Sequence, residues 1–279
     1  MPVAIRLILL CLVVAAFTSG CAKGPRVQQP GPEFSVLTLN IWHDQRDWPA
    51  RKAIMVEEIR RLNPDVICLQ EVLQRETLPN QAKTLAEELG YVMTFSTTDP
   101  PENAHRYGNA ILTRHKALAS EMKMLEPLDD YRTVAHMKID IDGLVVDVYS
   151  THLHHTGDGG AIRSRQIEDL VGFIDASRST ANVIVAGDFN TSPGSPELEP
   201  MHAGFTDTLA LFVDDPLSEE HATLNWHLGH TRRRIDYVWQ RHSARETFRP
   251  VRSEIVLDEP DATGDVWASD HFGVITWFR

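Results

Sequence analysis

The chain has 279 residues, of which 42% are hydrophobic and 24% are charged, and its formal net charge is −12. This is an ordinary globular composition. The acidic balance excludes a protein that wraps long nucleic acid by bulk electrostatic attraction, since phosphate contacts need lysine and arginine. A local positive patch is compatible with that balance. The arginine run at residues 232–234 is a candidate, although we expect it to be solvated charge rather than a phosphate clamp.

The N-terminus has the features of a targeting segment. Arg6 precedes an apolar run at residues 7–17, which is too short to span a bilayer comfortably and resembles a signal-peptide core. The following T-S-G-C resembles the lipobox of bacterial lipoproteins, in which the cysteine is lipidated and becomes the new N-terminus. Thr18 departs from that motif, which prefers leucine there. Ordinary cleavage with release and a retained anchor are the alternatives.

We therefore expect a lipoprotein signal peptide at residues 1–20, lipidation of Cys21, a flexible tether at residues 22–33 and one domain at residues 34–279. The chain would be exported and anchored to a membrane, on the periplasmic or outer-membrane side in a Gram-negative cell, with secretion as the alternative. No protein partner is predicted. Cys68 lies in an apolar run and is expected in the core, so no disulfide framework is available.

The predicted elements alternate in type along the chain. Strands and helices form a βαβ unit first, then hairpin strands around Asp142-Gly143, and then a second βαβ unit. Strands are predicted at residues 34–40, 65–72, 91–96, 108–114, 133–141, 144–153, 183–190, 235–239 and 272–278. Helices are predicted at residues 50–64, 77–90 and 161–176, and surface loops at 99–107, 154–160 and 212–231. This order predicts an α/β fold with two mixed sheets and helices outside them.

Polar side chains mark the ends of these strands. In V-I-V-A-G-D-F-N, Asp188 and Asn190 are two residues apart, and such residues on an extended segment point the same way. A polar strand end leading into an Asx-type turn is the alternative. Ligands in α/β sheets bind beyond the carboxyl ends of strands, which favours a cleft. The full set is Asn40, Glu71, His152, Asp188 with Asn190, Asp236, and Asp270 with His271.

This set resembles the endonuclease/exonuclease/phosphatase superfamily of DNase I-like metal phosphoesterases. The matching pieces are L-N-I-W, L-Q-E-V, G-N-A-I-L-T-R, T-H-L, G-D-F-N, R-R-I-D-Y-V and S-D-H-F-G-V, in the family's order over residues 36–276. The resemblance implies a four-layer α/β sandwich of two mixed sheets flanked by helices, with the site between the sheets. It also implies hydrolysis of a phosphate ester with Mg²⁺, or with Mn²⁺ or Ca²⁺.

The resemblance and the chemistry together suggest roles for these residues. A phosphodiester is an anion, so attack by water needs charge neutralisation by a hard divalent ion held by carboxylates. Glu71, with Asn40 and Asp270, is expected to hold the metal. Asp188 is expected to activate water, and Asn190 to orient Asp188 or to donate to the phosphoryl oxygens. His271 is expected to bind the phosphoryl group or to transfer a proton, with Asp236 orienting its ring. His152 is expected to donate to the phosphate or to protonate the leaving oxygen.

Each residue also has a simpler interpretation. Glu71 could cap a turn, and Asn40 is a common turn residue. The histidines at residues 154 and 155 could be solvated or form a second metal site, and Asn109 could contact substrate or only turn the chain. Trp42, Trp226 and Trp239 are expected to pack rather than to stack on a substrate.

The sequence leads to a metal-dependent phosphodiesterase as the first hypothesis. Its substrate would be nucleic acid, a phospholipid headgroup or a small phosphate ester. The alternatives are a phosphate monoesterase acting on inositol or sugar phosphates, and a catalytically retired module that binds a phosphorylated ligand at the cell surface.

Overall fold

The computed structural model describes residues 32–245 and 247–279. The expectations for residues 1–31, including the signal peptide, Cys21 and most of the tether, fall outside the described residues. Among those that are described, no helix is both long and apolar enough to cross a bilayer.

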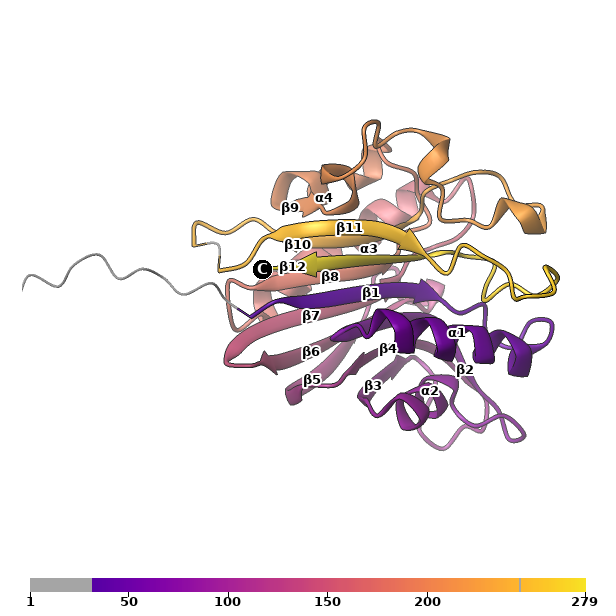
Figure 1. The fold of residues 1–279 in the computed structure, drawn as a ribbon. Coiled ribbons are helices and arrows are strands. Elements are labelled where there is room, and N and C mark those ends of the chain that lie inside the picture. Colours follow the sequence, from indigo (N-terminus) through magenta and orange to yellow (C-terminus); the bar gives the residue numbers. More distant parts are fainter. Residues whose placement is uncertain (1–31, 246) are drawn as a thin grey trace, which may run out of the picture. The chain divides into compact units, whose positions relative to one another are not determined.

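Two six-stranded sheets form the middle of the fold (Figure 1). Across the first sheet the order is β11 (Pro250–Val256), β12 (Gly273–Phe278), β1 (Phe34–Asn40), β2 (Val66–Gln74), β4 (Arg106–Thr113) and β3 (Val92–Thr97). Across the second it is β5 (Lys116–Met124), β6 (Thr133–Ile141), β7 (Leu144–His152), β8 (Val183–Asp188), β10 (Asp236–Arg241) and β9 (Phe205–Asp207). The pairs β1–β2 and β7–β8 are parallel and the other pairs antiparallel, so both sheets are mixed as predicted.

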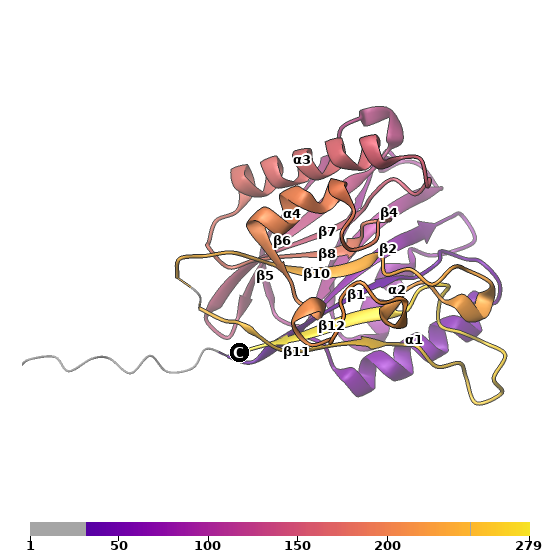
Figure 2. The same ribbon diagram turned by 90° about the horizontal axis from the view of Figure 1, so that it is seen from above.

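Helices cover the two outer faces and complete four layers. In Figure 2, α3 (Gly160–Ser177) and α4 (Glu199–Gly204) lie on one side and α1 (Trp48–Leu62) on the other. The helix α2 (Gln81–Leu89) packs with α1 against the first sheet, because Leu85 shares a buried cluster with Met55 and Leu37. This confirms the predicted sandwich of two mixed sheets flanked by helices.

Three apolar cores separate the four layers. Alternate residues of β1 face opposite sides, so Val36 lies between the sheets while Leu37 lies beneath α1 and α2. Cys68 is fully buried in the core between the sheets, as expected for a small core residue. The third core packs Ile167 and Leu170 of α3 against the second sheet. The central strands β1, β2 and β8 are thus buried on two faces, which explains their nearly continuous apolar runs.

Several boundaries differ from the predicted ones because side-chain caps set them. The first helix begins at Trp48, two residues early, since the Asp47 side chain accepts the N–H of Ala50 at 3.1 Å. The second begins at Gln81 rather than Thr77, because Asn80 accepts the N–H of Lys83 at 3.0 Å. Strand β8 ends at Asp188, before Asn190.

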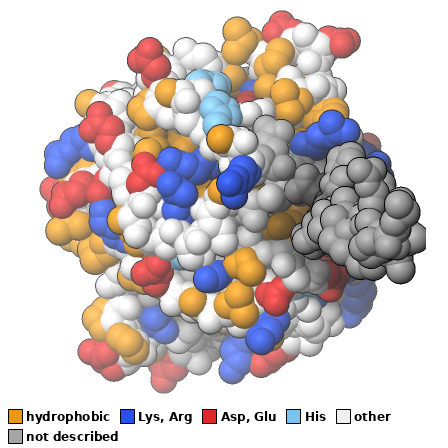
Figure 3. Space-filling view, turned by 90° about the vertical axis from the view of Figure 1, so that its left-hand side faces the viewer, with side chains coloured by type: hydrophobic (Ala, Val, Ile, Leu, Met, Phe, Trp, Pro, Cys, Tyr) orange, Lys and Arg blue, Asp and Glu red, His pale blue; other side chains and the backbone are white. Residues whose placement is uncertain are grey.

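Three strands have no counterpart in the prediction, namely β5, β9 and β11. Strand β5 is an edge strand whose residues are mostly exposed, so its sequence carries no alternation of apolar and polar side chains. Strand β9 has only three residues. At the end of the sandwich seen in Figure 3, basic and acidic side chains are interspersed over the visible surface. That view shows no continuous area of one charge among the coloured side chains.

Candidate active site

The polar residues predicted at the strand ends meet at one end of the sandwich. Asn40, His152 and Asp188 are the last residues of β1, β7 and β8, and Asp236 is the first residue of the antiparallel β10. The register pairs His152 with Asp188 and Asp188 with Asp236 on neighbouring strands. Because β1 and β8 belong to different sheets, the site is built from both sheets.

The Asp188 carboxylate is at the centre of this cluster. Its Oδ2 accepts a hydrogen bond from Asn40 Nδ2 at 3.0 Å, and it lies 3.4 Å from His152 Nε2 and 3.8 Å from His271 Nε2. Its Oδ1 accepts the backbone N–H of Asn190 at 2.9 Å. Asp188 is 1% exposed. One carboxylate oxygen is therefore held by the backbone while the other faces three polar side chains.

Asn190 supports Asp188 in a different way from the predicted one. The residue has φ +53°, outside the extended region, so the alternation rule for strands does not apply to it. The two residues instead form an Asx-type turn, the alternative interpretation of this stretch. The Asn190 side-chain amide donates to Leu153 O at 3.0 Å, which fixes the loop after β7.

The glycine before Asp188 allows β7 and β8 to approach closely. Gly187 has φ +152°, and a Cβ at this position would lie 2.0 Å from Thr151 O. Any larger residue would push the end of β8 away from β7. The glycine of G-D-F-N therefore sets the distance between His152 and Asp188.

His271 and Asp236 form the pair that the sequence predicted. His271 Nδ1 lies 2.9 Å from Asp236 Oδ2, and both residues are buried. This contact fixes the ring so that Nε2 faces Asp188. Asp236 is itself held by the Thr223 hydroxyl, which accepts the N–H groups of Ile235 and Asp236 at 3.0 and 3.1 Å.

Glu71 reaches the site through an irregularity in β2. The pairing of β2 with β4 shifts between Leu69 and Val72, and Glu71 has φ +58°. Such a bulge redirects a side chain, which here brings Glu71 Oε1 to 3.2 Å from Asn40 Nδ2. The Asn40 Oδ1 atom accepts the N–H of Trp42 at 3.0 Å. Asn40 is thus bound to Glu71 and Asp188 through its amide nitrogen.

Asp270 lies beside this group, in the segment before β12. Its Oδ1 accepts the hydroxyl of Ser269 at 3.3 Å, and the same hydroxyl lies 2.6 Å from Asn40 O. The Oδ2 atom is 3.6 Å from His230 Nε2. Ser269 therefore ties Asp270 to the end of β1.

Burial and the neighbouring charges shift the ionisation of these groups. Burial, followed by the nearby Asp236 carboxylate, raises the pKa of Asp188 to about 7. Burial lowers the pKa of His271, but the carboxylates of Asp236 and Asp188 outweigh it and hold that pKa well above the usual value. Burial, with the Arg132 charge, lowers the pKa of His152 well below its usual value. At neutral pH His271 is therefore charged and His152 is neutral.

Two groups of side chains could hold a cation. Among the described residues, Asp188, Asp236 and His271 each offer an atom, and these atoms lie within 4.8 Å of one another. Within this group, Asp236 and His271 are also paired with each other through Oδ2 and Nδ1. The second group is the predicted one of Asn40, Glu71 and Asp270, which leaves that pair intact.

Two predicted residues have surroundings that the sequence did not show. The Asn109 amide donates to Thr133 O at 3.0 Å and to its hydroxyl at 3.3 Å, so it joins β4 of the first sheet to β6 of the second. The expectation that Arg234 is solvated charge is wrong. The residue is 3% exposed and lies 2.7 Å from Asp207 Oδ2.

Sequence reasoning missed Arg51, which is 2% exposed in α1. Its five N–H groups reach the carbonyl oxygens of Ile41, Trp42, His43, Gln45 and Ala268 at 2.6–3.1 Å. These carbonyls belong to the segments that follow Asn40 and precede Asp270. The burial of Arg51 could not be seen in the sequence, because arginine side chains are mostly exposed on helix surfaces.

Comparison with known proteins identifies the fold and its family. The sequence profile of the Endonuclease/Exonuclease/phosphatase family matches residues 37–271. The chain belongs to this family. Its members are phosphoric ester hydrolases, and the matched region contains every residue of the polar cluster described above.

Relatives and solved structures agree with this membership. The chain is 27% identical over 202 residues to Protein angel homolog 2 of Bos taurus, which covers 59% of this chain and 36% of that protein. It spans at most half the length of the first curated relatives it matches. The catalytic domain of human Nocturnin with bound sulfate has a TM-score of 0.72 at 24% identity, covering 91% of this chain and 95% of that one. TDP2 of D. rerio, complexed with single-strand DNA product, has a TM-score of 0.72 at 19% identity, covering 89% and 100%.

Proposed function

We propose that this endonuclease/exonuclease/phosphatase family chain hydrolyses phosphodiesters by in-line attack of water, with a divalent cation and without a covalent enzyme intermediate. The arrangement around Asp188 is the observation that carries this proposal. A buried carboxylate oxygen lies within 4 Å of an amide and two imidazoles, at the end of the sandwich where the strand ends of both sheets meet. These groups can accept a proton from water and donate to phosphoryl oxygens.

The donor set fits a hard divalent cation such as Mg²⁺. Glu71 and Asp270 offer carboxylate oxygens on either side of Asn40: Glu71 Oε1 lies 3.2 Å from Asn40 Nδ2, and the Ser269 hydroxyl connects Asp270 Oδ1 with Asn40 O. Oxygen donors of this kind suit Mg²⁺, and Mn²⁺ and Ca²⁺ prefer them as well. Glu71 and Asp270 would hold the ion, with Asn40 beside them. When bound, the ion would neutralise the charge of the phosphate and of the transition state.

Asp188 is the proposed general base. Its Oδ2 faces the cluster, and Asn40 and the Asn190 backbone hold the carboxylate in place. A base works best when its pKa lies near the working pH, and burial together with Asp236 raises the pKa of Asp188 to about 7. Asp188 would accept the proton of the attacking water.

The two histidines take different roles because their charges differ. His271 is charged, with Nδ1 on Asp236, so its Nε2–H would donate to the phosphoryl oxygens or give a proton to the leaving oxygen. His152 is neutral and would donate a hydrogen bond from Nε2. Of the two roles first considered for His152, this favours donation to the phosphate over protonation of the leaving group.

Nucleic acid is the substrate class that the comparisons favour. The structure of TDP2 that resembles this fold contains single-strand DNA product, and that of Nocturnin contains sulfate. The net charge of −12 weighs against long duplexes. A phospholipid headgroup and a phosphate monoester are the competing outcomes of the test below.

The test is hydrolysis by the purified chain with Mg²⁺ and with EDTA. The substrates are single-stranded DNA, RNA, sphingomyelin and inositol phosphates. We expect turnover of a nucleic-acid diester that EDTA abolishes and Mg²⁺ restores. Asp188→Asn removes the base, so kcat should fall about 100- to 10,000-fold.

Asp142→Asn is the matched control, because Asp142 is exposed in the hairpin turn between β6 and β7. It should retain the activity of the unchanged chain. Turnover that survives EDTA, or that Asp188→Asn leaves unchanged, would refute the proposal. Phosphate binding without turnover in both the unchanged chain and Asp188→Asn would favour the retired binding module.

We also propose that the chain is exported and anchored through lipid on Cys21, on the strength of the N-terminal sequence alone. In a bacterial host, the unchanged chain should fractionate with membranes and take up labelled fatty acid. Cys21→Ala should do neither. Equal labelling of both forms would refute the anchor.

A further inference from the structure

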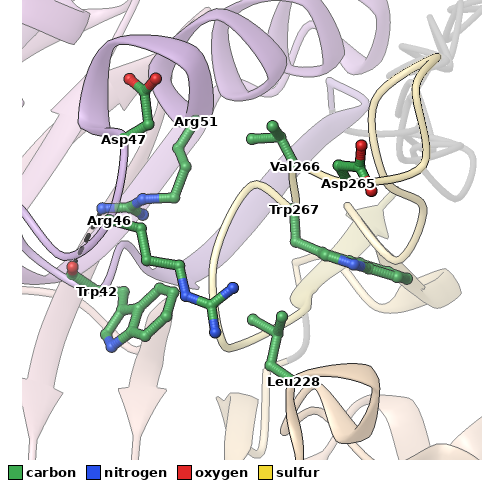
Figure 4. Close-up of a pocket in the computed structure, with 8 residues that line it drawn as sticks. All are labelled: Trp42, Arg46, Asp47, Arg51, Leu228, Asp265, Val266 and Trp267. Carbon is green, nitrogen blue, oxygen red and sulfur yellow. Dashed lines mark hydrogen bonds between the residues drawn. The ribbon is translucent and has the colours of Figure 1, made fainter.

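A small cavity lies beside the polar cluster. Its volume is about 190 Å³, and it opens between the segment that follows β1 and the segment that precedes β12. Figure 4 shows Trp42 on one side, Trp267 and Leu228 on the other, and the Arg46 side chain extending between them. Arg51 lines the cavity from α1.

The walls of this cavity are the segments that carry the proposed metal ligands. The N–H of Trp42 donates to Asn40 Oδ1 at 3.0 Å, and Trp267 precedes Asp270 by three residues. Arg51 joins the two segments, since its Nη1 binds Ile41 O at 2.7 Å and Ala268 O at 3.0 Å. The cavity therefore shares its walls with the segments that would hold a phosphate at Asn40 and Asp270.

The lining is flat and mostly apolar. The Arg46 guanidinium lies 5.4 Å from the centre of the Trp42 ring. The Trp267 ring stacks on His227 at 4.6 Å and 15°, which fixes its orientation. The carboxylates of Asp47 and Asp265 also border the cavity, but in Figure 4 they point away from the space between Arg46 and Trp267. A hydroxyl-rich ring such as a sugar or inositol would therefore find few hydrogen-bond acceptors in the cavity.

The size of the cavity limits what it can hold. Pockets for drug-sized ligands have volumes of about 300–1,000 Å³. A cavity of about 190 Å³ suits one planar ring system rather than a whole nucleotide or a lipid chain. Planar bases stack on indole rings and on arginine guanidinium groups without regard to sequence.

We propose that this cavity is a subsite for one nucleobase next to the scissile phosphate. The inference rests on the proposed phosphodiesterase function and narrows its substrate class to diesters that carry a nucleoside. Trp42 was expected from the sequence to pack, and Trp267 was not singled out. Both are only partly buried, and both line the cavity.

The first test compares dinucleotides with and without their bases. The full chain is given a thymidine dinucleotide, the two forms that lack one base, and the form that lacks both. Removing one particular base should lower kcat/KM about 10- to 100-fold, as expected for loss of a stacked base. Trp267→Leu should reduce that preference to less than about threefold.

Two further variants make the result specific. Trp277→Leu is the matched control, because Trp277 lies at the far end of β12 under Arg252 and should keep the preference. Leu228→Glu places a charge in the cavity and should abolish the preference even if Trp267→Leu does not fold. Equal rates on all four dinucleotides, or a preference that both cavity variants retain, would overturn the subsite.

A binding measurement separates this inference from the proposed reaction. Adenosine 5′-monophosphate and ribose 5-phosphate are titrated into Asp188→Asn with Mg²⁺, by equilibrium dialysis. Tighter binding of the nucleotide that Trp267→Leu removes would support the subsite even if no diester is hydrolysed. Equal binding of the two, with hydrolysis intact in the unchanged chain, would overturn the subsite and leave the reaction standing.

Discussion

Replacing Arg51 by lysine should loosen both segments that carry the proposed metal ligands. Arg51 is 2% exposed, and its guanidinium donates five hydrogen bonds to backbone carbonyls. Burial lowers its pKa to about 10, so it stays charged at neutral pH. Lysine keeps the charge but has three donors on a single nitrogen. At least two carbonyls would lose their partner.

The size of the effect follows from that count. Each hydrogen bond that is lost costs about 0.5–1.5 kcal/mol, so two give a loss of about 1–3 kcal/mol in the free energy of unfolding. Activity should fall as well, because Ile41 O adjoins Asn40 and Ala268 O lies two residues before Asp270. A displacement near 1 Å in such a site can lower kcat/KM about 100-fold.

Urea unfolding and the Mg²⁺ dependence of turnover measure the two effects. Arg60→Lys is the matched control, since Arg60 lies in the same helix with its side chain 58% exposed. It should change the free energy of unfolding by less than about 0.5 kcal/mol. For Arg51→Lys we expect a lower urea midpoint and a higher Mg²⁺ concentration for half-maximal turnover. A variant with the stability and Mg²⁺ dependence of the unchanged chain would show that Arg51 does not hold these segments.

Two further predictions concern buried residues other than the proposed metal ligands. Burial raises the pKa of Asp147, but hydrogen bonds from His136 and from the N–H groups of Ser179 and Thr180 outweigh burial and hold that pKa below its usual value. Its stabilisation is therefore full above the unfolded pKa and is lost as the pH falls through the folded one. Asp147→Asn should lower the free energy of unfolding by about 1–3 kcal/mol at pH 7. Urea titrations should show the difference from the unchanged chain shrinking below about pH 4, and a difference that stays constant with pH would contradict the role of the Asp147 charge. Gly187→Ala should lower the free energy of unfolding by about 2 kcal/mol or more, since its Cβ would meet Thr151 O. Gly172→Ala in α3 is the control, because that position has open space and the change should be neutral or slightly stabilising. Equal melting temperatures for the two variants would contradict the close approach of β7 and β8.

The sequence predicted the parts of this site that depend on local periodicity. Strand ends can be located from apolar runs and turn residues, so Asn40, His152 and Asp188 were found without a structure. The pair of Asp236 and His271 followed from the resemblance to the family. Which atom of each residue faces the cluster is a tertiary property, and the roles assigned to these residues remain predictions.

The rest of the site depends on contacts that no local pattern shows. Glu71 is directed by a bulge in β2, and the Ser269 hydroxyl binds a carbonyl 229 residues away. Arg51 looked like one of several arginines on an amphipathic helix, although its contacts with Ala268 span 217 residues. Asn190 shows the opposite error. A rule for extended strands was applied two residues beyond the end of the strand, where the backbone had already turned.

The division of the site between the two sheets links catalysis to the packing between them. Asn40, Glu71 and His271 come from the first sheet or the segment next to it, while Asp188 and Asp236 come from the second. Two short contacts cross this boundary, from Asn40 to Asp188 at 3.0 Å and from His271 to Asp236 at 2.9 Å. The apolar core between the sheets, which includes Val36, Val148 and Ile184, holds the two halves at that separation. Because a close-packed core transmits strain and relaxes only partly around a cavity, a cavity made in this core should disturb the site from a distance. The site is therefore a property of the whole sandwich, and neither sheet carries it alone.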